Sequence, residues 1–87
     1  MKNFCGYDVS EDVFEFIQGI IDYVETNFGF AISSSKHYIY IDPIEDHVVV
    51  KCDERCIKKY ASAEELLINF EIDNKKLIEL LEDFDYA

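Results

Sequence analysis

Two cysteines, Cys52 and Cys56, lie four positions apart in a segment that could hold a metal ion. His47 precedes Cys52 by five positions, and Cys5 or His37 could supply a fourth ligand to a zinc ion. Structural zinc is held by four ligands, which usually come as two closely spaced pairs along the chain. This sequence contains only one such pair. We therefore expect reduced cysteines at a strand end and its connector, with no bound metal or cofactor.

The other reactive side chains do not form a catalytic motif. Redox-active cysteine pairs of the Cys-x-x-Cys type have two intervening residues, whereas this pair has three. The chain has only three scattered glycines, which cannot form a phosphate-binding loop, and it has no nucleophile-elbow sequence. Carboxylates are abundant, but general acid–base catalysis requires one of them to be buried with a shifted pKa. We expect a protein that is not an enzyme.

The chain of 87 residues is strongly acidic, with 19 Asp and Glu against 8 Lys and Arg and a formal net charge of −11. Binding a polyanion requires basic side chains that displace its counterions, so this balance argues against direct nucleic-acid binding and against an anionic membrane surface. Its length fits a single domain over residues 1–87. Because no secretory leader or transmembrane run is apparent and the cysteine number is odd, we expect a cytoplasmic protein.

The acidic residues are concentrated in the two terminal parts of the chain. Residues 1–35 hold six acids and one base, residues 36–63 hold five of each, and residues 64–87 hold eight acids and two bases. Four acids recur at helical spacing in the first part and three cluster in the last: Glu11, Glu15, Asp22, Glu25, Glu79, Glu82 and Asp83. Like charges at this spacing destabilise a helix by about 0.2–0.5 kcal/mol per pair. We expect these residues to form a partner-binding surface.

The strongest periodic signal lies in residues 9–27 and predicts a helix. Its apolar face consists of Val13, Phe16, Ile17, Ile20, Ile21, Val24 and Phe28. Asp8 or Ser10 could cap the first turn, and Asp8 also has the spacing of a capping box. Residues 27–29 should end the helix, with Gly29 able to take the left-handed conformation of a helix stop. Gly19 costs about 1 kcal/mol relative to Ala inside a helix, which favours close packing against a neighbour over a functional reason for the glycine.

Residues 30–52 change to the two-residue period of β-strands. Expected strands cover 30–32, 37–41 and 47–52, with a turn over 42–46. Alternation places Ile39 and Ile41 on one face of the sheet and Tyr38 and Tyr40 on the other. The tyrosine face should be half exposed, where it either covers the sheet or forms a binding surface.

The rest of the chain predicts two helices after a charged connector at 53–60. Ser62 and Glu65 match a capping box that begins the first of these helices. Residues 72–74 interrupt the pattern, and the last helix should cover about 74–84. Three amphipathic helices would then cover an antiparallel meander in the order α-β-β-β-α-α, which is an α+β fold.

The apolar faces also predict the core and how the domain is stabilised. The expected centre of the core is Phe16, Ile20, Ile39, Ile41, Val48, Val50, Leu66, Leu67, Leu77 and Leu81. Because these faces supply a continuous core and the cysteines lack a complete ligand set, we expect folding without metal or disulfide.

The segment from Tyr60 to Leu77, YASAEELLINFEIDNKKL, resembles the C-terminal part of small, acidic, functionally uncharacterised proteins of gut Firmicutes and their mobile elements. This resemblance covers about the last third of the chain, and its helix-turn-helix-like packing pattern contains no catalytic residues. Separately, the size, acidity and element order are similar to those of some small phage anti-CRISPR proteins that imitate nucleic acid. That second similarity is one of architecture alone.

Two functions of different classes fit these features. In the first, the acidic helix faces bind a basic surface of another protein, so that the chain acts as an inhibitor or adaptor. In the second, acidity only keeps the chain in solution, and the sheet face with Tyr38 and Tyr40 mediates association of a structural or accessory domain. Salt separates the two, because carboxylate-driven association weakens as the Debye length shrinks and apolar association does not.

Overall fold

The structure is a computed structural model that describes residues 2–53 and 56–87. Its large antiparallel sheet contains, in spatial order, β6 (Cys56–Tyr60), β5 (His47–Cys52), β4 (Tyr38–Ile44), β3 (Phe30–Ser33) and β9 (Asp85–Tyr86). The helices are α1 (Glu11–Glu25), α2 (Ala63–Asn69), α3 (Leu77–Leu80) and the 3₁₀ turn η1 (Leu81–Asp83). Two hairpins are formed by β1 (Lys2–Phe4) with β2 (Tyr7–Val9), and by β7 (Glu71–Ile72) with β8 (Lys75–Lys76).

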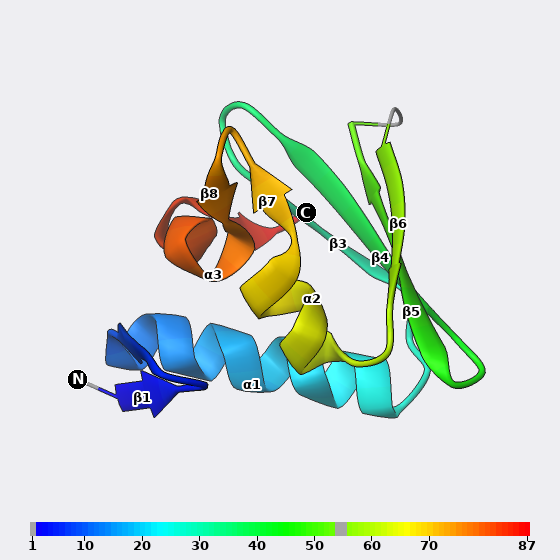
Figure 1. The fold of residues 1–87 in the computed structure, drawn as a ribbon, viewed down its shortest axis with the longest axis horizontal. Helices are drawn as coiled ribbons and strands as arrows, with labels where there is room; N and C mark the ends of the chain where they lie inside the picture. Colours follow the sequence, from blue (N-terminus) through cyan, green and yellow to red (C-terminus); the bar gives the residue numbers. More distant parts are fainter. Residues whose placement is uncertain (1, 54–55) are drawn as a thin grey trace.

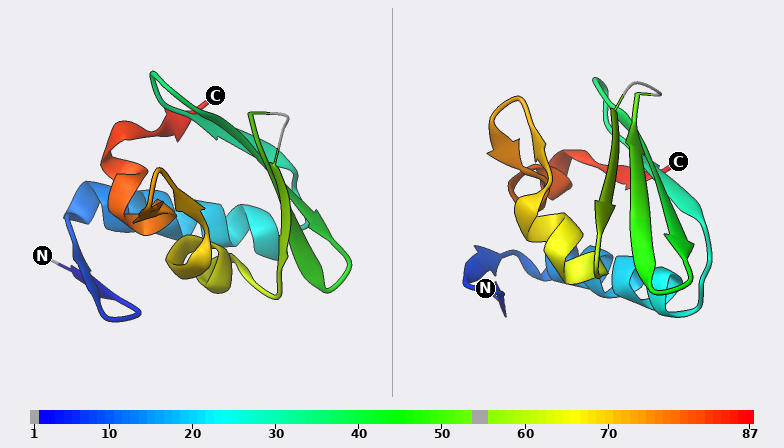
Figure 2. Two further views of the ribbon diagram at one scale, coloured as in Figure 1. Left: turned by 45° about the horizontal axis from the view of Figure 1, so that its top comes forward. Right: turned by 45° about the vertical axis from the view of Figure 1, so that its right-hand side comes forward.

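The helices lie on one side of the large sheet and leave its other face open (Figures 1 and 2). The predicted α+β class, with three α-helices and a mostly antiparallel sheet, is confirmed. The predicted element order is only loosely followed, because both small hairpins and the strands β6 and β9 were not expected.

One cluster of buried apolar side chains joins α1, α2 and α3 to the inner face of the sheet. Nine of the ten predicted core residues are buried, and Phe16 is partly buried against the same cluster. The exception on the predicted helical face is Phe28, which lies beyond the end of α1 and is exposed.

Both ends of α1 differ in detail from the prediction. The Ser10 hydroxyl accepts a hydrogen bond from the N–H of Val13 at 3.2 Å, so Ser10 is the N-cap, and Asp8 belongs to β2 instead. At the other end, Asn27 takes the left-handed conformation with φ 58°, whereas Gly29 does not. The prediction of Gly29 as the helix stop was wrong, because Asn also tolerates this conformation and stands closer to the last turn.

Strand β4 is longer than expected and runs through Pro43, which is paired with Val48 of β5. The predicted turn over 42–46 shrinks to two residues, the first of which, Glu45, has a positive φ of 54°. Pairing of β3 with β4 reaches no further than Ile41. One side of β4 is therefore free at Pro43, where a strand tolerates a residue without an N–H group.

The predicted connector over 53–60 was wrong over residues 56–60, which form the edge strand β6, whereas Asp53 lies in a turn after β5; residues 54–55 lie outside the described residues. The register places Cys56 opposite Cys52, and Lys58 and Lys59 are exposed. Charged side chains are common on edge strands, where one side of the backbone is unpaired and open to water. The high charge of this segment is therefore the reason why the sequence predicted a connector and not an edge strand.

The predicted helix over 74–84 was wrong in its first part. Asp73 and Asn74 both have positive φ values, 54° and 67°, and form the two-residue turn between β7 and β8. Tight hairpins favour such a pair of left-handed residues. A hairpin therefore separates α2 from α3 where the sequence resembled a helix-turn-helix pattern.

The beginning of α2 follows the prediction closely. The Ser62 hydroxyl accepts the N–H of Glu65 at 3.2 Å, and the Glu65 carboxylate accepts the N–H of Ala61 at 3.1 Å. This reciprocal arrangement is a capping box in which the carboxylate reaches one residue further back than usual.

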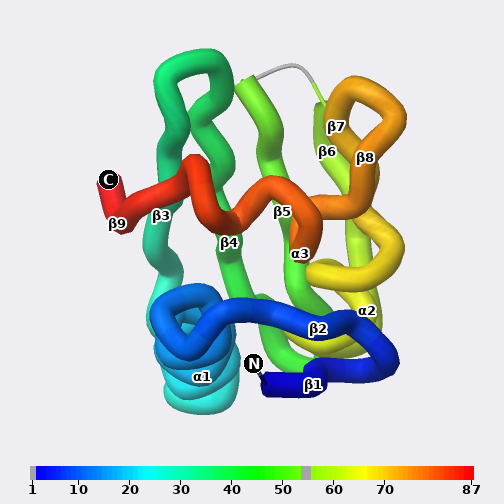
Figure 3. The backbone as a smooth tube through the Cα atoms, turned by 90° about the vertical axis from the view of Figure 1, so that its left-hand side faces the viewer, coloured from blue at the N-terminus to red at the C-terminus, as the bar shows by residue number. Residues whose placement is uncertain are grey.

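The C-terminal segment returns to the sheet after η1. Strand β9 pairs antiparallel with β3, beside which it lies at one edge of the sheet (Figure 3). Within residues 2–53 and 56–87, no helix is long and apolar enough to cross a membrane.

Candidate functional site

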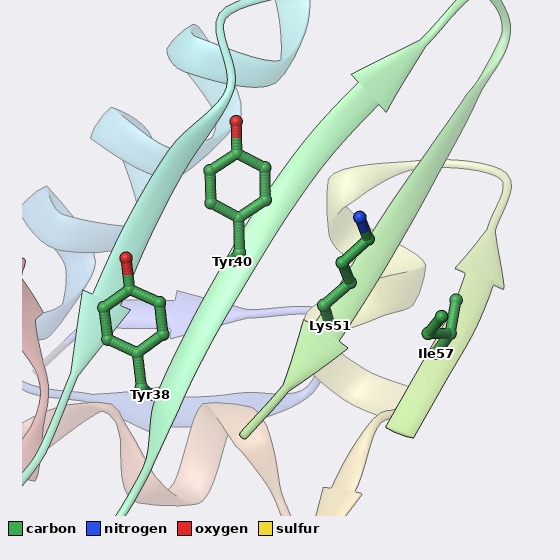
Figure 4. Close-up of a pocket in the computed structure, with 4 residues that line it drawn as sticks. All are labelled: Tyr38, Tyr40, Lys51 and Ile57. Carbon is green, nitrogen blue, oxygen red and sulfur yellow. The ribbon is translucent and has the colours of Figure 1, made fainter. Parts of the chain in front are cut away.

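The sheet face turned away from the helices carries exposed apolar side chains. Tyr38 and Tyr40 project from β4 with 48% and 36% of their surface exposed, and Ile57 on β6 is 63% exposed. The register aligns Tyr40, Lys51 and Ile57 across three neighbouring strands. Together with Tyr38 they line a shallow depression of about 530 Å³ (Figure 4). The predicted exposure of the tyrosine face is therefore confirmed, and we call these four residues the open sheet face.

Few charged residues surround the open sheet face. By strand alternation, its neighbours on the same side of the sheet include Lys59 on β6 and Asp42 on β4. Lys51 contributes an ammonium group within the row itself. The face therefore has no large excess of either charge, in contrast to the helices on the other side of the sheet.

The structure divides the predicted acidic stripe of α1. All four of its acids are exposed, and in the part of the chain that the structure describes none of them forms an ion pair. Glu11, Glu15 and Asp22 border one shallow depression of about 540 Å³, which they share with Lys2 of the N-terminal hairpin. Glu25 borders a different hollow, next to the β4–β5 turn. Three of the four acids thus share one surface.

The acids predicted near the C-terminus are also separated. Glu79, Glu82 and Asp83 are exposed, as a solvated edge requires. Glu82 borders a hollow next to the first turn of α1, whereas Asp83 borders another hollow that includes His37. Glu79 borders neither of these hollows. These three residues therefore share no hollow, in contrast to three of the acids on α1.

A polar cluster that the sequence did not reveal lies where β4 begins and β5 ends. His37 Nδ1 is 2.8 Å from Asp53 Oδ2, and His37 Nε2 is 3.2 Å from Asp73 Oδ2. Asp53 has a left-handed φ of 51°, and its Oδ1 accepts the N–H of Tyr38 at 2.8 Å. The Cys52 thiol lies 3.5 Å from Asp53 Oδ2 and can donate to it. His37 thereby connects the β7–β8 turn to the end of the large sheet.

The surroundings of this cluster shift the pKa values of its members. The hydrogen bond to Asp53 raises the pKa of His37 above 6.5 more than burial lowers it, and the bond to Asp73 adds to the rise. The hydrogen bonds from His37 and the Tyr38 N–H lower the pKa of Asp53. Burial, followed by the charge of Asp53, raises the pKa of Cys52 to about 11. The Cys52 thiol is therefore protonated near neutral pH and is not activated as a nucleophile.

The structure brings together only some of the metal ligands considered from the sequence. Cys56 lies opposite Cys52 in the register of β5 and β6. His47 lies beside Asp46 at the β4–β5 turn, which is the opposite end of β5 from Cys52. Cys5 lies in the turn of the N-terminal hairpin and is exposed. Of the residues considered, His37 does approach Cys52, and Asp53 joins them. The sequence shows that Asp53 follows Cys52, but it does not reveal the left-handed backbone conformation of Asp53.

The chain matches no protein-family model, no curated protein and no solved structure at a level that indicates a relationship.

Proposed function

We propose that this protein is a non-enzymatic protein-binding domain whose contact surface is the open sheet face. The observation that carries the proposal is the alignment of Tyr40, Lys51 and Ile57 in one exposed row, with Tyr38 beside it. Tyrosines combine a large apolar area with a hydroxyl group and are enriched among the residues that dominate binding energy at interfaces. Ile57 adds aliphatic area that gains from removal from water.

The partner is a different protein with an apolar surface, rather than a second copy of this chain. Each copy has a formal net charge of −11, so two copies repel each other. A partner that presents apolar side chains to the tyrosines and Ile57, with one carboxylate facing Lys51, matches the chemistry of the face. Because most of the contact is apolar, its affinity depends weakly on salt.

A second candidate function uses the acidic stripe against a basic protein surface. The observation that favours it is the shared depression bordered by Glu11, Glu15 and Asp22, which form no ion pair among the described residues. Carboxylates arranged in this way accelerate encounter with a basic partner and bind it most tightly at low salt. On this alternative, the protein is an inhibitor or adaptor that occupies a nucleic-acid-binding groove.

Site-specific photocrosslinking separates the two surfaces. A photoreactive phenylalanine analogue is placed at Tyr40 in one variant and at Glu15 in another, and the crosslinked partner from each is identified and purified. The matched control places the same analogue at Tyr23, which is exposed but lies on α1 outside both surfaces. The proposal expects a specific crosslink from position 40 that neither of the other positions produces.

The purified partner is then titrated against point variants at low and high salt. Tyr40→Ala and Ile57→Ala should each weaken binding by about tenfold or more, as truncation of central contact residues does, and high salt should have little effect. The double variant Glu15→Lys with Asp22→Lys should bind normally. Loss of binding in this double variant, together with strong salt sensitivity, would instead support the acidic stripe. A partner that binds all variants equally refutes both functions.

A further inference from the structure

We propose that His37, Cys52 and Asp53 form a binding site for a single Zn²⁺ ion. Their donor atoms, an imidazole nitrogen, a thiol sulfur and a carboxylate oxygen, all lie within 4.8 Å of one another. These are the three donor types that zinc prefers in proteins. The site lies at the end of the sheet on the side of the β7–β8 turn, next to Tyr38 of the open sheet face, and its ligands are none of the four residues of that face.

Two of the three distances within the cluster are close to those of a zinc site, and the third, between His37 and Cys52, is bounded only by the 4.8 Å that contains all three donor atoms. Zinc–ligand bonds of about 2.0–2.3 Å at tetrahedral angles place neighbouring donor atoms about 3.3–3.6 Å apart. Asp53 Oδ2 is 3.5 Å from Cys52 Sγ and 2.8 Å from His37 Nδ1. The separation between Asp53 Oδ2 and His37 Nδ1 has to widen by about half an ångström on this geometry, and the His37 imidazole and the Cys52 thiol have to approach to about 3.5 Å. Water would complete the coordination in the fourth position.

The backbone of Asp53 explains how two consecutive residues can share one ion. Successive side chains of a strand point to opposite faces, so Cys52 and Asp53 would diverge if β5 continued. The left-handed φ of 51° at Asp53 ends the strand and turns its carboxylate back toward Cys52 and His37. A second bond, from the Tyr38 N–H to Asp53 Oδ1, holds that carboxylate in place while leaving Oδ2 for the ion.

Asp73 supplies the supporting contact that metal-bound histidines usually have. A ligating imidazole generally donates its other ring N–H to a carboxylate, which fixes the tautomer and the ring orientation. His37 offers Nδ1 to the site, and its Nε2 lies 3.2 Å from Asp73 Oδ2. Figure 3 shows the β7–β8 turn, which carries Asp73, at the same end of the molecule as the β3–β4 connection before β4.

Charge balance also favours a divalent cation. Binding would displace two protons to solvent, that of the Cys52 thiol as the sulfur–zinc bond forms and that of His37 Nδ1 as the nitrogen–zinc bond forms, while the proton on Nε2 keeps its bond to Asp73 and the imidazole becomes neutral. The resulting thiolate and the carboxylate of Asp53 together neutralise the two positive charges of the ion. Asp53 is exposed, so the ion can reach the site from solvent without opening the core.

Titration of the full chain with Co²⁺ under a thiol-free reductant tests this site, because cobalt reports its ligands in its absorption spectrum. We expect one Co²⁺ per chain, a thiolate-to-cobalt charge-transfer band, the visible bands of tetrahedral cobalt, and bleaching of all of them by Zn²⁺. Cys52→Ser should remove the charge-transfer band. His37→Gln and Asp53→Asn should weaken Co²⁺ binding by about tenfold or more, and Asp73→Asn should weaken it while keeping the bands in position.

The control variants replace the two cysteines and the histidine that are not ligands in the proposed zinc site. Cys5→Ser, Cys56→Ser and His47→Gln should leave the spectrum and the affinity unchanged. If Cys52→Ser fails to fold because Cys52 is buried, His37→Gln carries the same test, because its imidazole is partly exposed. The absence of a charge-transfer band in the unmodified protein would overturn the proposal. Loss of that band in Cys56→Ser, or its persistence in a folded Cys52→Ser, would also overturn the proposed ligand set.

Discussion

The hydroxyl oxygen of Tyr86, on β9, occupies the space in which a Cβ atom at Gly19 of α1 would lie. The Tyr86 ring also packs edge-on against Phe16, with 4.9 Å between ring centroids, and against Tyr23 at 5.7 Å. Gly19 therefore has the close-packing role that the sequence predicted. The short last strand is held partly by this contact between its side chain and α1.

A double-mutant cycle can measure this contact. Gly19→Ala should gain about 1 kcal/mol from helix propensity, but in the unmodified protein much of that gain is lost when the new methyl group displaces the Tyr86 hydroxyl. In a Tyr86→Phe background the hydroxyl is absent, and Gly19→Ala should stabilise the protein by nearly the full amount. Urea unfolding of the four proteins gives the coupling. Equal effects of Gly19→Ala in both backgrounds would show that the contact has no energetic role.

The His37 cluster should make stability depend on pH. The pKa of Asp53 is lowered, so its contribution is present above the ordinary aspartate range and is lost as pH falls through its lowered value. The pKa of His37 is raised above 6.5, so its contribution is complete below 6.5 and is lost as pH rises through the raised value. The stabilising contributions of Asp53 and His37 are therefore both complete between the ordinary aspartate pKa range and pH 6.5.

We therefore expect His37→Gln to lower the melting temperature more at about pH 6 than at about pH 9, where the imidazole of the unmodified protein is neutral. Thermal unfolding in the presence of a chelator measures the metal-free protein. Asp73→Asn, which removes only the weaker of the two partners, should reduce the melting temperature by less at pH 6. A His37→Gln effect of the same size at both pH values would contradict the charge-based account.

Truncation of the core should be strongly destabilising. Ile20 on α1 and Leu67 on α2 are both fully buried, and replacing either with Ala should reduce the free energy of unfolding by about 2–5 kcal/mol. Denaturant unfolding followed by circular dichroism measures this change. Ile57→Ala is a matched control, because Ile57 is 63% exposed and should change stability by less than about 0.5 kcal/mol. Losses below about 1 kcal/mol at both buried sites would mean that the core tolerates cavities unusually well.

Reversing charge on α1 should not destabilise the fold. Glu15 and Asp22 are exposed and form no ion pair among the described residues, while both stand near other acids of the same helix. Replacing both with Lys should leave the melting temperature unchanged or raise it, and any rise should shrink as salt screens the charges. A marked fall in the melting temperature at low salt would show that these carboxylates have stabilising contacts.

Sequence patterns predicted the parts of the fold that have a long local period. The helix α1 spans four turns with a regular apolar face, and β4 shows the alternation that correctly assigned Ile39 and Tyr40 to opposite faces. Strands of two or three residues contain too few positions to display a period, so β7, β8 and β9 could not be found in this way. The dipeptide Asp73–Asn74 was the available signal for a hairpin turn.

The candidate sites were predicted less completely than the fold. Tyr38 and Tyr40 were assigned to the open face from alternation alone, but Ile57 was missed because its segment looked like a connector. The cluster around His37 depends on contacts between distant segments and on a left-handed backbone at Asp53. The spacing of residues along the chain predicts neither these contacts nor this backbone conformation.

The strand register divides the large sheet into a local and a distant part. Within the β4–β5–β6 meander, Ile44 pairs with His47 and Cys52 pairs with Cys56, so its pairing closes small loops and can form early. Pairing of Ser33 with Asp85, by contrast, closes a loop that includes the whole meander, α2 and α3. Loop-closure entropy delays contacts of this kind in the folding reaction. The pairing of the edge strand β9 with β3 should therefore be the last part of the sheet to become protected from hydrogen exchange during refolding.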